Sequence, residues 1–208
     1  MLKLTKADIR RGGRHPVVWK RASTLVIHEP SEDDYTLLKA YRSISLLSYL
    51  GNLVEKVVAE VLIEEAKRTE LLSDGQFGSR NGRSGIVTAT IMVDRAHVAW
   101  RNAHITGVLH IDIKAAFPSV AKGRLVNLMK IIRMDGDLIQ LTESILSERM
   151  VQMTIECNTI ERHPVEVGVA QGSPVSPILF AIYTSGLIKW DEVYVSGAEG
   201  LSFVKDLG

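Results

Sequence analysis

The sequence of 208 residues has one cysteine, Cys157, and a formal net charge of only +1. One cysteine excludes an internal disulfide and fits a reducing, intracellular compartment. A net charge near zero leaves no overall positive field that would by itself argue for nucleic-acid binding. Charge is uneven, however: residues 1–21 hold seven lysines and arginines against one acid, and residues 29–34 hold four acids and no base. Two interpretations of the basic N-terminal segment stay open: it binds a phosphate backbone, or it forms a solvated helix face.

Long apolar runs are also missing. Residues 167–188 carry no charge and are numerous enough for a membrane helix, but Gln171, two prolines and two serines interrupt the first half. No membrane association is therefore expected. Lys3 and Lys6 are followed by no apolar segment of the kind that signal peptides contain. With 46% hydrophobic and 24% charged residues, the composition is that of an ordinary globular protein.

Hydrophobic periodicity predicts one continuous α+β globule. Apolar residues from Leu46 to Leu62 recur at helical spacing, which predicts a long helix with this stripe in the core and with Glu55 and Glu65 off the stripe. The other predicted elements are a strand at 25–27, a helix over 86–100 capped by Ser84, helices near 120–134 and 138–149 separated by a turn at 135–137, a hairpin of 151–155 with 165–167, and a helix from Ser176.

The stretch 107–120 organises the chain. Its apolar residues at 109, 111 and 113 alternate with polar ones, which predicts a strand with one buried and one polar face. Asp112 would stand on this strand, close to Phe117 and to a helix cap at Ser119. A single carboxylate is most often just solvated. Here Gln-Gly-Ser-Pro at 171–174 follows before a helix, and 202–206 reads as a second strand that bears a carboxylate.

Five segments in order resemble the motifs of reverse transcriptases. Residues 41–47 resemble the first motif, and the glycine-rich basic loop 76–84 resembles the second. Residues 112–120 resemble motif A, 168–177 resemble motif B, and 203–206 lie where motif C is expected. The sequences of these motifs are most similar to those of non-LTR (LINE-type) retrotransposons, particularly those of fungi. Each motif alone is a weak signal, whereas five in the right order are a strong one.

This resemblance implies a fingers–palm fold, with fingers in 1–105, a palm in 106–208, and an antiparallel sheet flanked by helices. It implies RNA-directed DNA synthesis from an RNA template, a DNA primer and deoxynucleoside triphosphates, with two Mg²⁺ ions. Such ions prefer oxygen ligands and stabilise the charge that develops in nucleotidyl transfer. The implied location is the nucleus, with the mitochondrion as the open alternative.

The resemblance also assigns residues. It implies that Asp112, Asp206 and the backbone carbonyl of Ile113 are magnesium ligands. Phe117 matches the aromatic gate that excludes a ribose 2′-hydroxyl, and Gln171 with Gly172 matches the loop along the incoming nucleotide. Three arginines would grip triphosphate or template: Arg42, Arg80 and Arg83.

Some positions depart from the family pattern. Lys205 stands where motif C has its first catalytic aspartate, and an ammonium group repels a metal ion by about 4 kcal/mol at about 4 Å and an effective dielectric of about 20. Glu-Pro-Ser-Glu at 29–32 replaces a Lys-Pro-Gly-Lys turn. The sequence ends two residues after Asp206, so we expect no thumb. Two hypotheses follow: a retroelement polymerase domain that is defective in this copy, or a non-catalytic remnant with weak nucleic-acid binding. A cyclase or nuclease on a related palm is disfavoured, because neither needs the fingers motifs or the 171–174 loop.

Overall fold

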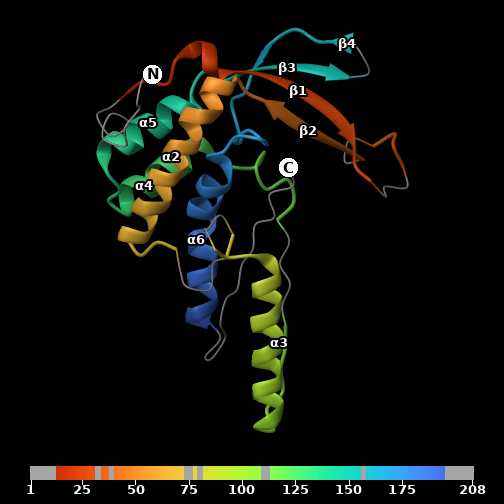
Figure 1. Cartoon of the computed structure of the whole chain (residues 1–208), viewed down its shortest axis with the longest axis vertical. Helices are drawn as coiled ribbons and strands as arrows, with labels where there is room; N and C mark the ends of the chain where they lie inside the picture. Colours follow the sequence, from red (N-terminus) through yellow and green to blue (C-terminus); the bar gives the residue numbers. More distant parts are fainter. Residues whose placement is uncertain are drawn as a thin grey trace.

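The computed structural model describes residues 13–30, 34–37, 40–72, 77–78, 82–108, 113–155 and 158–194, with only the backbone described for 187–194. This part of the chain has an α+β fold, as predicted. A twisted sheet lies at one end of the molecule, and most helices gather beside it and below it (Figure 1).

The sheet contains β1 (Arg21–His28), β2 (Tyr41–Leu46), β3 (Met150–Ile155) and β4 (Asn158–Thr159) in the order β2-β1-β3-β4, and β5 (His163–Pro164) also pairs with β3. β1 runs antiparallel to β2 but parallel to β3. The expected purely antiparallel sheet is therefore wrong. A long connection that includes several helices separates β1 from β3 in the chain, and such crossovers are what parallel neighbours require.

The strand expected at 165–167 is also wrong, because the chain leaves the sheet after Pro164. The Val165 amide still donates to the Arg149 carbonyl at 2.8 Å, and the Val165 carbonyl accepts a hydrogen bond from the Lys122 ammonium. Gly168 then adopts a φ of +85°. This turn directs the chain towards the segment before α4.

The helices are α2 (Tyr49–Arg68), α3 (Gly85–Arg101), α4 (Lys122–Ile131), α5 (Gly136–Leu146) and α6 (Ser176–Tyr194), with a short 3-10 helix η1 (Val17–Lys20). The Ser84 cap is confirmed, since its hydroxyl accepts from the Val87 amide at 3.3 Å. The turn predicted at 135–137 lies earlier, at residues 132 and 133, because Gly136 and Asp137 already belong to α5, which Asp135 caps. The Ser119 cap is wrong: its hydroxyl donates to the Ala116 carbonyl within a run of turns, and α4 begins later.

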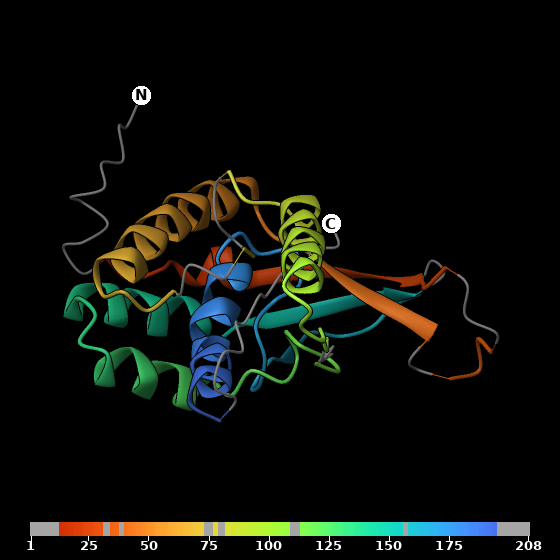
Figure 2. The same cartoon turned by 90° about the horizontal axis from the view of Figure 1, so that it is seen from below.

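Four helices, α2, α4, α5 and α6, enclose the hydrophobic core (Figure 2). Burying one such side chain stabilises the fold by about 1.5–3 kcal/mol. The largest fully buried apolar residues are Leu62, Leu125, Met129, Leu138, Ile145, Ile178, Leu179 and Ile182.

The predicted core stripe of α2 is only partly right. Leu50 and Leu53 are 62% and 60% exposed, whereas Glu55 and Glu65 are buried. The buried face is displaced around the helix because both carboxylates have tertiary partners. Glu65, for example, accepts from the Asp135 amide at 2.9 Å and from Arg68.

α3 stands away from this core (Figure 1) and buries none of its residues fully. Ile86 and Trp100 are 80% and 61% exposed. Across the described residues, no helix combines the length and the apolar character that a bilayer crossing needs.

Most of the strand predicted around Asp112 falls on 109–112, which lie outside the described residues. The flanking residues Val108 and Ile113 belong to no strand, and Lys114 begins a series of turns. The prediction is therefore wrong for its described end and stays a prediction for the rest.

Candidate functional site

Three segments that are far apart in the sequence meet beside the sheet: β2, the turns at 114–119, and the turn at 168–173. The Ser45 amide of β2 donates to the Gln171 carbonyl at 2.9 Å. The Val169 amide donates to the Phe117 carbonyl at 3.0 Å, and the Gly168 amide donates to the Val120 carbonyl at 2.9 Å. These backbone bonds bring the segments of Phe117, Gln171 and Gly172 into one region.

Two glycines make this close approach possible. Gly172 has a φ of +99°, and a Cβ atom there would lie 2.7 Å from the Ser45 carbonyl oxygen. Gly168 has a φ of +85°, and its Cβ would lie 2.8 Å from the Pro118 carbonyl oxygen. Both positions exclude side chains by conformation and by space. The 168–172 turn is therefore pressed against β2 on one side and against the turn after Phe117 on the other.

Phe117 is held by the core. Its ring packs edge-on against Phe180 of α6, with the centroids 5.6 Å apart and an interplanar angle of 75°. The Phe117 side chain is half-buried, so the rest of it remains at the surface. Edge-to-face pairs of this kind restrain both rings. The contact with Phe180 thus holds the Phe117 ring in place next to the turn.

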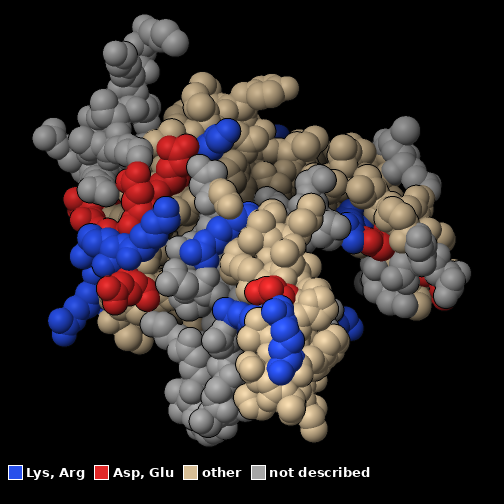
Figure 3. Space-filling model, turned by 60° about the horizontal axis from the view of Figure 1, so that its bottom comes forward, with Lys and Arg blue, Asp and Glu red and all other residues tan. Residues whose placement is uncertain are grey.

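Arg42 does not face the same side of the sheet as Ser45, because successive side chains of a strand alternate between its faces. Its guanidinium forms an ion pair with Glu29, the first residue of the acidic turn. The positive charge of Arg42 is therefore already matched within the β1–β2 hairpin. The face of the molecule drawn in Figure 3 carries side chains of both charge signs.

Of the other two predicted arginines, Arg83 lies just before α3, with its guanidinium 4.9 Å from the centroid of the Phe77 ring. A cation over an aromatic face is an attractive contact. Arg80 lies outside the described residues.

A family model described as reverse transcriptase (RNA-dependent DNA polymerase) matches residues 27–196. The chain belongs to the reverse transcriptase family. The matched range includes β2, Phe117 and the 168–173 turn, so the segments that meet in space all lie within it.

Curated relatives of this reverse transcriptase chain come from mobile elements. It is 28% identical over 172 residues to the probable RNA-directed DNA polymerase from transposon BS of Drosophila melanogaster, which covers 83% of this chain and 19% of that protein. It is 27% identical over 175 residues to the RNA-directed DNA polymerase from mobile element jockey of the same species, covering 84% and 19%. The chain thus spans about a fifth of the length of these relatives. The expected likeness to fungal elements stays a prediction.

The metal ligands expected for a reverse transcriptase are not tested by the structure. Asp112, Lys205 and Asp206 lie outside the described residues, and of the expected ligands only Ile113, which is exposed, is described. Within the described ranges, no group of three histidine, cysteine, aspartate or glutamate residues is placed to hold a metal ion. The magnesium site therefore stays a prediction from the motifs.

Sequence reasoning missed a buried polar cluster behind the reverse transcriptase turn. Glu55 accepts hydrogen bonds from the Ser173 hydroxyl and from the Arg149 guanidinium, and His15 lies against the same carboxylate. The one local signal was the spacing of Glu55 from Gly51, Val58 and Leu62, which puts it on the buried face of α2.

Proposed function

We propose that this chain is the fingers-and-palm part of a non-LTR retrotransposon reverse transcriptase, with fingers in 1–105 and a palm in 106–208. The observation that carries the proposal is the set of backbone hydrogen bonds that fix the 168–172 turn to β2 and to the Phe117 segment. The family match and the mobile-element relatives support it. A nuclear location is part of the proposal through the same family.

The surface around the turn would receive the incoming deoxynucleoside triphosphate. Gln171 and Gly172 would lie along the nucleotide, since Gln171 is half-buried and Gly172 is exposed at this turn. The ring of Phe117, fixed by Phe180, would oppose a ribose 2′-hydroxyl by steric contact. Arg83 and Arg80 would contribute positive charge for the template or the triphosphate, and Arg42 would do so only when its pair with Glu29 opens.

The donor set of the proposed metal site does not fit two magnesium ions well. Asp112, Asp206 and the Ile113 carbonyl offer oxygen atoms, which suits Mg²⁺. Lys205 adds a cation directly before Asp206 in the sequence. An ammonium group cannot ligate a metal ion and repels one that lies nearby. We therefore propose that this copy retains nucleotide binding and is defective in catalysis.

The alternative function is a non-catalytic remnant whose residual activity is weak nucleic-acid binding. Two features favour it: Lys205 in motif C, and the Glu29–Arg42 pair, which neutralises one of the arginines expected to contact phosphate. The two functions differ in one observable, which is specific nucleotide binding.

Competition with a fluorescent dATP analogue tests the proposal. Unlabelled dATP should displace the analogue from the full chain at lower concentration than ATP does. Phe117→Val should reduce this preference, because the smaller side chain leaves room for a 2′-hydroxyl. As a control, Trp100→Val on the exposed α3 should leave the preference unchanged. Absence of saturable analogue binding, or an equal preference in the Phe117 variant, would contradict the proposal.

A further inference from the structure

Glu55 is a charged residue with no exposure at all, on the buried face of α2. One oxygen of its carboxylate accepts from the Ser173 hydroxyl and the other from the Arg149 guanidinium. A buried carboxylate is tolerated only with such partners, because taking the charge out of water is costly. The two partners are separated from Glu55 by 118 and 94 residues of sequence.

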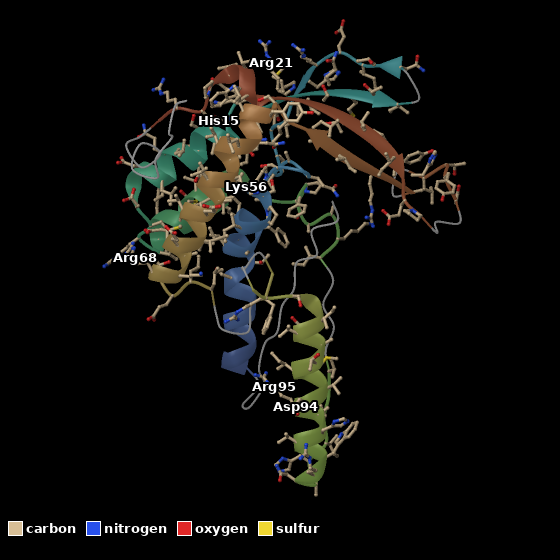
Figure 4. All side chains as sticks on the ribbon, viewed as in Figure 1. His15, Arg21, Lys56, Arg68, Asp94 and Arg95 are labelled. Atoms are coloured by element: carbon tan, nitrogen blue, oxygen red, sulfur yellow. The ribbon has the colours of Figure 1, made fainter. Side chains whose placement is uncertain are left out.

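The partners of Glu55 are themselves held in place. Arg149 is 5% exposed, and its Nε atom donates to the Ile145 carbonyl of α5 at 2.8 Å. His15 is 3% exposed, with its Nε2 atom 3.7 Å from the carboxylate and its ring against Trp19. Figure 4 shows His15 in the N-terminal segment beside α2 and α5. The carboxylate thus lies in a buried frame formed by the N-terminal segment, α2 and the α5–β3 junction.

Ser173 is the link from this frame to the turn. It follows Gly172 directly, it is 3% exposed, and its amide donates to the Ala170 carbonyl at 3.2 Å. The turn is also closed by Ser176, whose hydroxyl donates to the same Ala170 carbonyl at 2.6 Å. The Ser45–Gln171 bond fixes the turn to the sheet, and the Glu55–Ser173 bond fixes it to the helical core.

We propose that Glu55 is a positioning residue of this reverse transcriptase chain. Through Ser173 it sets the place of Gln171 and Gly172, while Arg149 balances its charge. This role rests on the proposed nucleotide-binding function of the turn. It makes the turn dependent on a residue of α2 that lies outside motif B and does not itself reach the surface.

Hydrogen–deuterium exchange on the full chain tests the role without requiring catalysis. Ser173→Ala removes the bond to Glu55 and should speed exchange of the 168–173 amides by roughly tenfold, because a hydrogen bond to a charged group is lost. Exchange in α4 should not change. Thr142→Val is the matched control, since it also removes a buried hydroxyl, one that bonds only within α5.

Two further variants separate positioning from general stability. Glu55→Gln keeps a hydrogen-bonding group next to the Ser173 hydroxyl, which can donate to an amide oxygen or accept from an amide NH2, so its turn should exchange more slowly than that of Glu55→Ala. Affinity for the fluorescent dATP analogue should fall severalfold in Ser173→Ala and stay at the parent value in Thr142→Val. If Glu55→Ala fails to fold, Ser173→Ala still tests whether the Glu55–Ser173 bond positions the turn.

The possible outcomes distinguish this role from the proposed function. If Ser173→Ala speeds exchange of the turn but the parent chain binds no nucleotide, the Glu55 anchor is supported and the proposed function is overturned. Nucleotide binding by the parent, with unchanged exchange and affinity in Ser173→Ala, would overturn the positioning role alone.

Discussion

Gly172→Ala should destabilise the chain much more than Gly82→Ala, although both glycines have positive φ angles, +99° and +75°. An alanine in this region of φ costs about 1–2 kcal/mol at either position. At Gly172 the new Cβ would also lie 2.7 Å from the Ser45 carbonyl oxygen, whereas at Gly82 it would meet no atom within 4 Å. Overpacking of this kind adds about 1–3 kcal/mol. The expected losses are therefore about 2–5 kcal/mol for Gly172→Ala and about 1–2 kcal/mol for Gly82→Ala.

Urea denaturation followed by far-ultraviolet circular dichroism measures both losses. In a chain of this size, each kcal/mol also lowers the Tm by about 2–4 °C. The difference between the two losses cancels the cost of backbone conformation, which both variants share. It therefore reports the contact of the new Cβ at position 172 with β2. Equal losses for the two variants would refute the close packing of the turn against Ser45.

Three other predictions concern charge. Burial and nearby positive charges lower the pKa of His15 from 6.5 to about 4. The unfolded chain therefore takes up this proton first, so the free energy of unfolding should fall by up to about 3 kcal/mol between pH 6.5 and 4. His15→Phe should lose that part of the pH dependence in urea titrations, and an unchanged dependence would contradict the assignment. Lys205→Asp should gain magnesium binding in titration calorimetry; no gain would argue against the placement of motif C. Binding to RNA, followed by fluorescence anisotropy, should weaken steeply with salt. Glu29→Gln should tighten it by freeing Arg42, and affinity independent of salt would exclude an electrostatic basis.

Local sequence patterns predicted the helices well because their signals are local. Ser84 and Asp135 are capping residues whose bonds reach only two or three positions along the chain. The proline at 177, just after the first residue of α6, marks a helix start in the same way. These features need no knowledge of the rest of the fold.

The buried face of α2 was harder to predict because distant residues determine it. Glu55 is stabilised inside by Arg149 and Ser173, so a carboxylate occupies a place that periodicity assigns to apolar residues. Leu50 and Leu53 are displaced to the exposed side as a result. The parallel pairing of β1 with β3 is likewise a tertiary property that strand patterns alone do not specify.

The roles of the candidate site residues stay predictions, and the contacts between their segments were not predicted. The motif resemblance named Phe117, Gln171 and Gly172, and the structure brings their segments together. The sequence did not reveal that the turn bonds to the edge of β2, or that Glu29 engages Arg42. An ion pair between two exposed-looking residues depends on the hairpin register, which no local pattern reports.

Photolabelling with 8-azido-dATP tests the central claim most directly, because it locates the bound nucleotide in the chain. We expect the label in peptides that contain Phe117 or residues 168–176, with protection by excess unlabelled dATP and little labelling of Gly172→Ala. The Gly82→Ala variant should label like the parent. Labelling confined to other peptides, or labelling that dATP does not compete away, would contradict a nucleotide site at this turn.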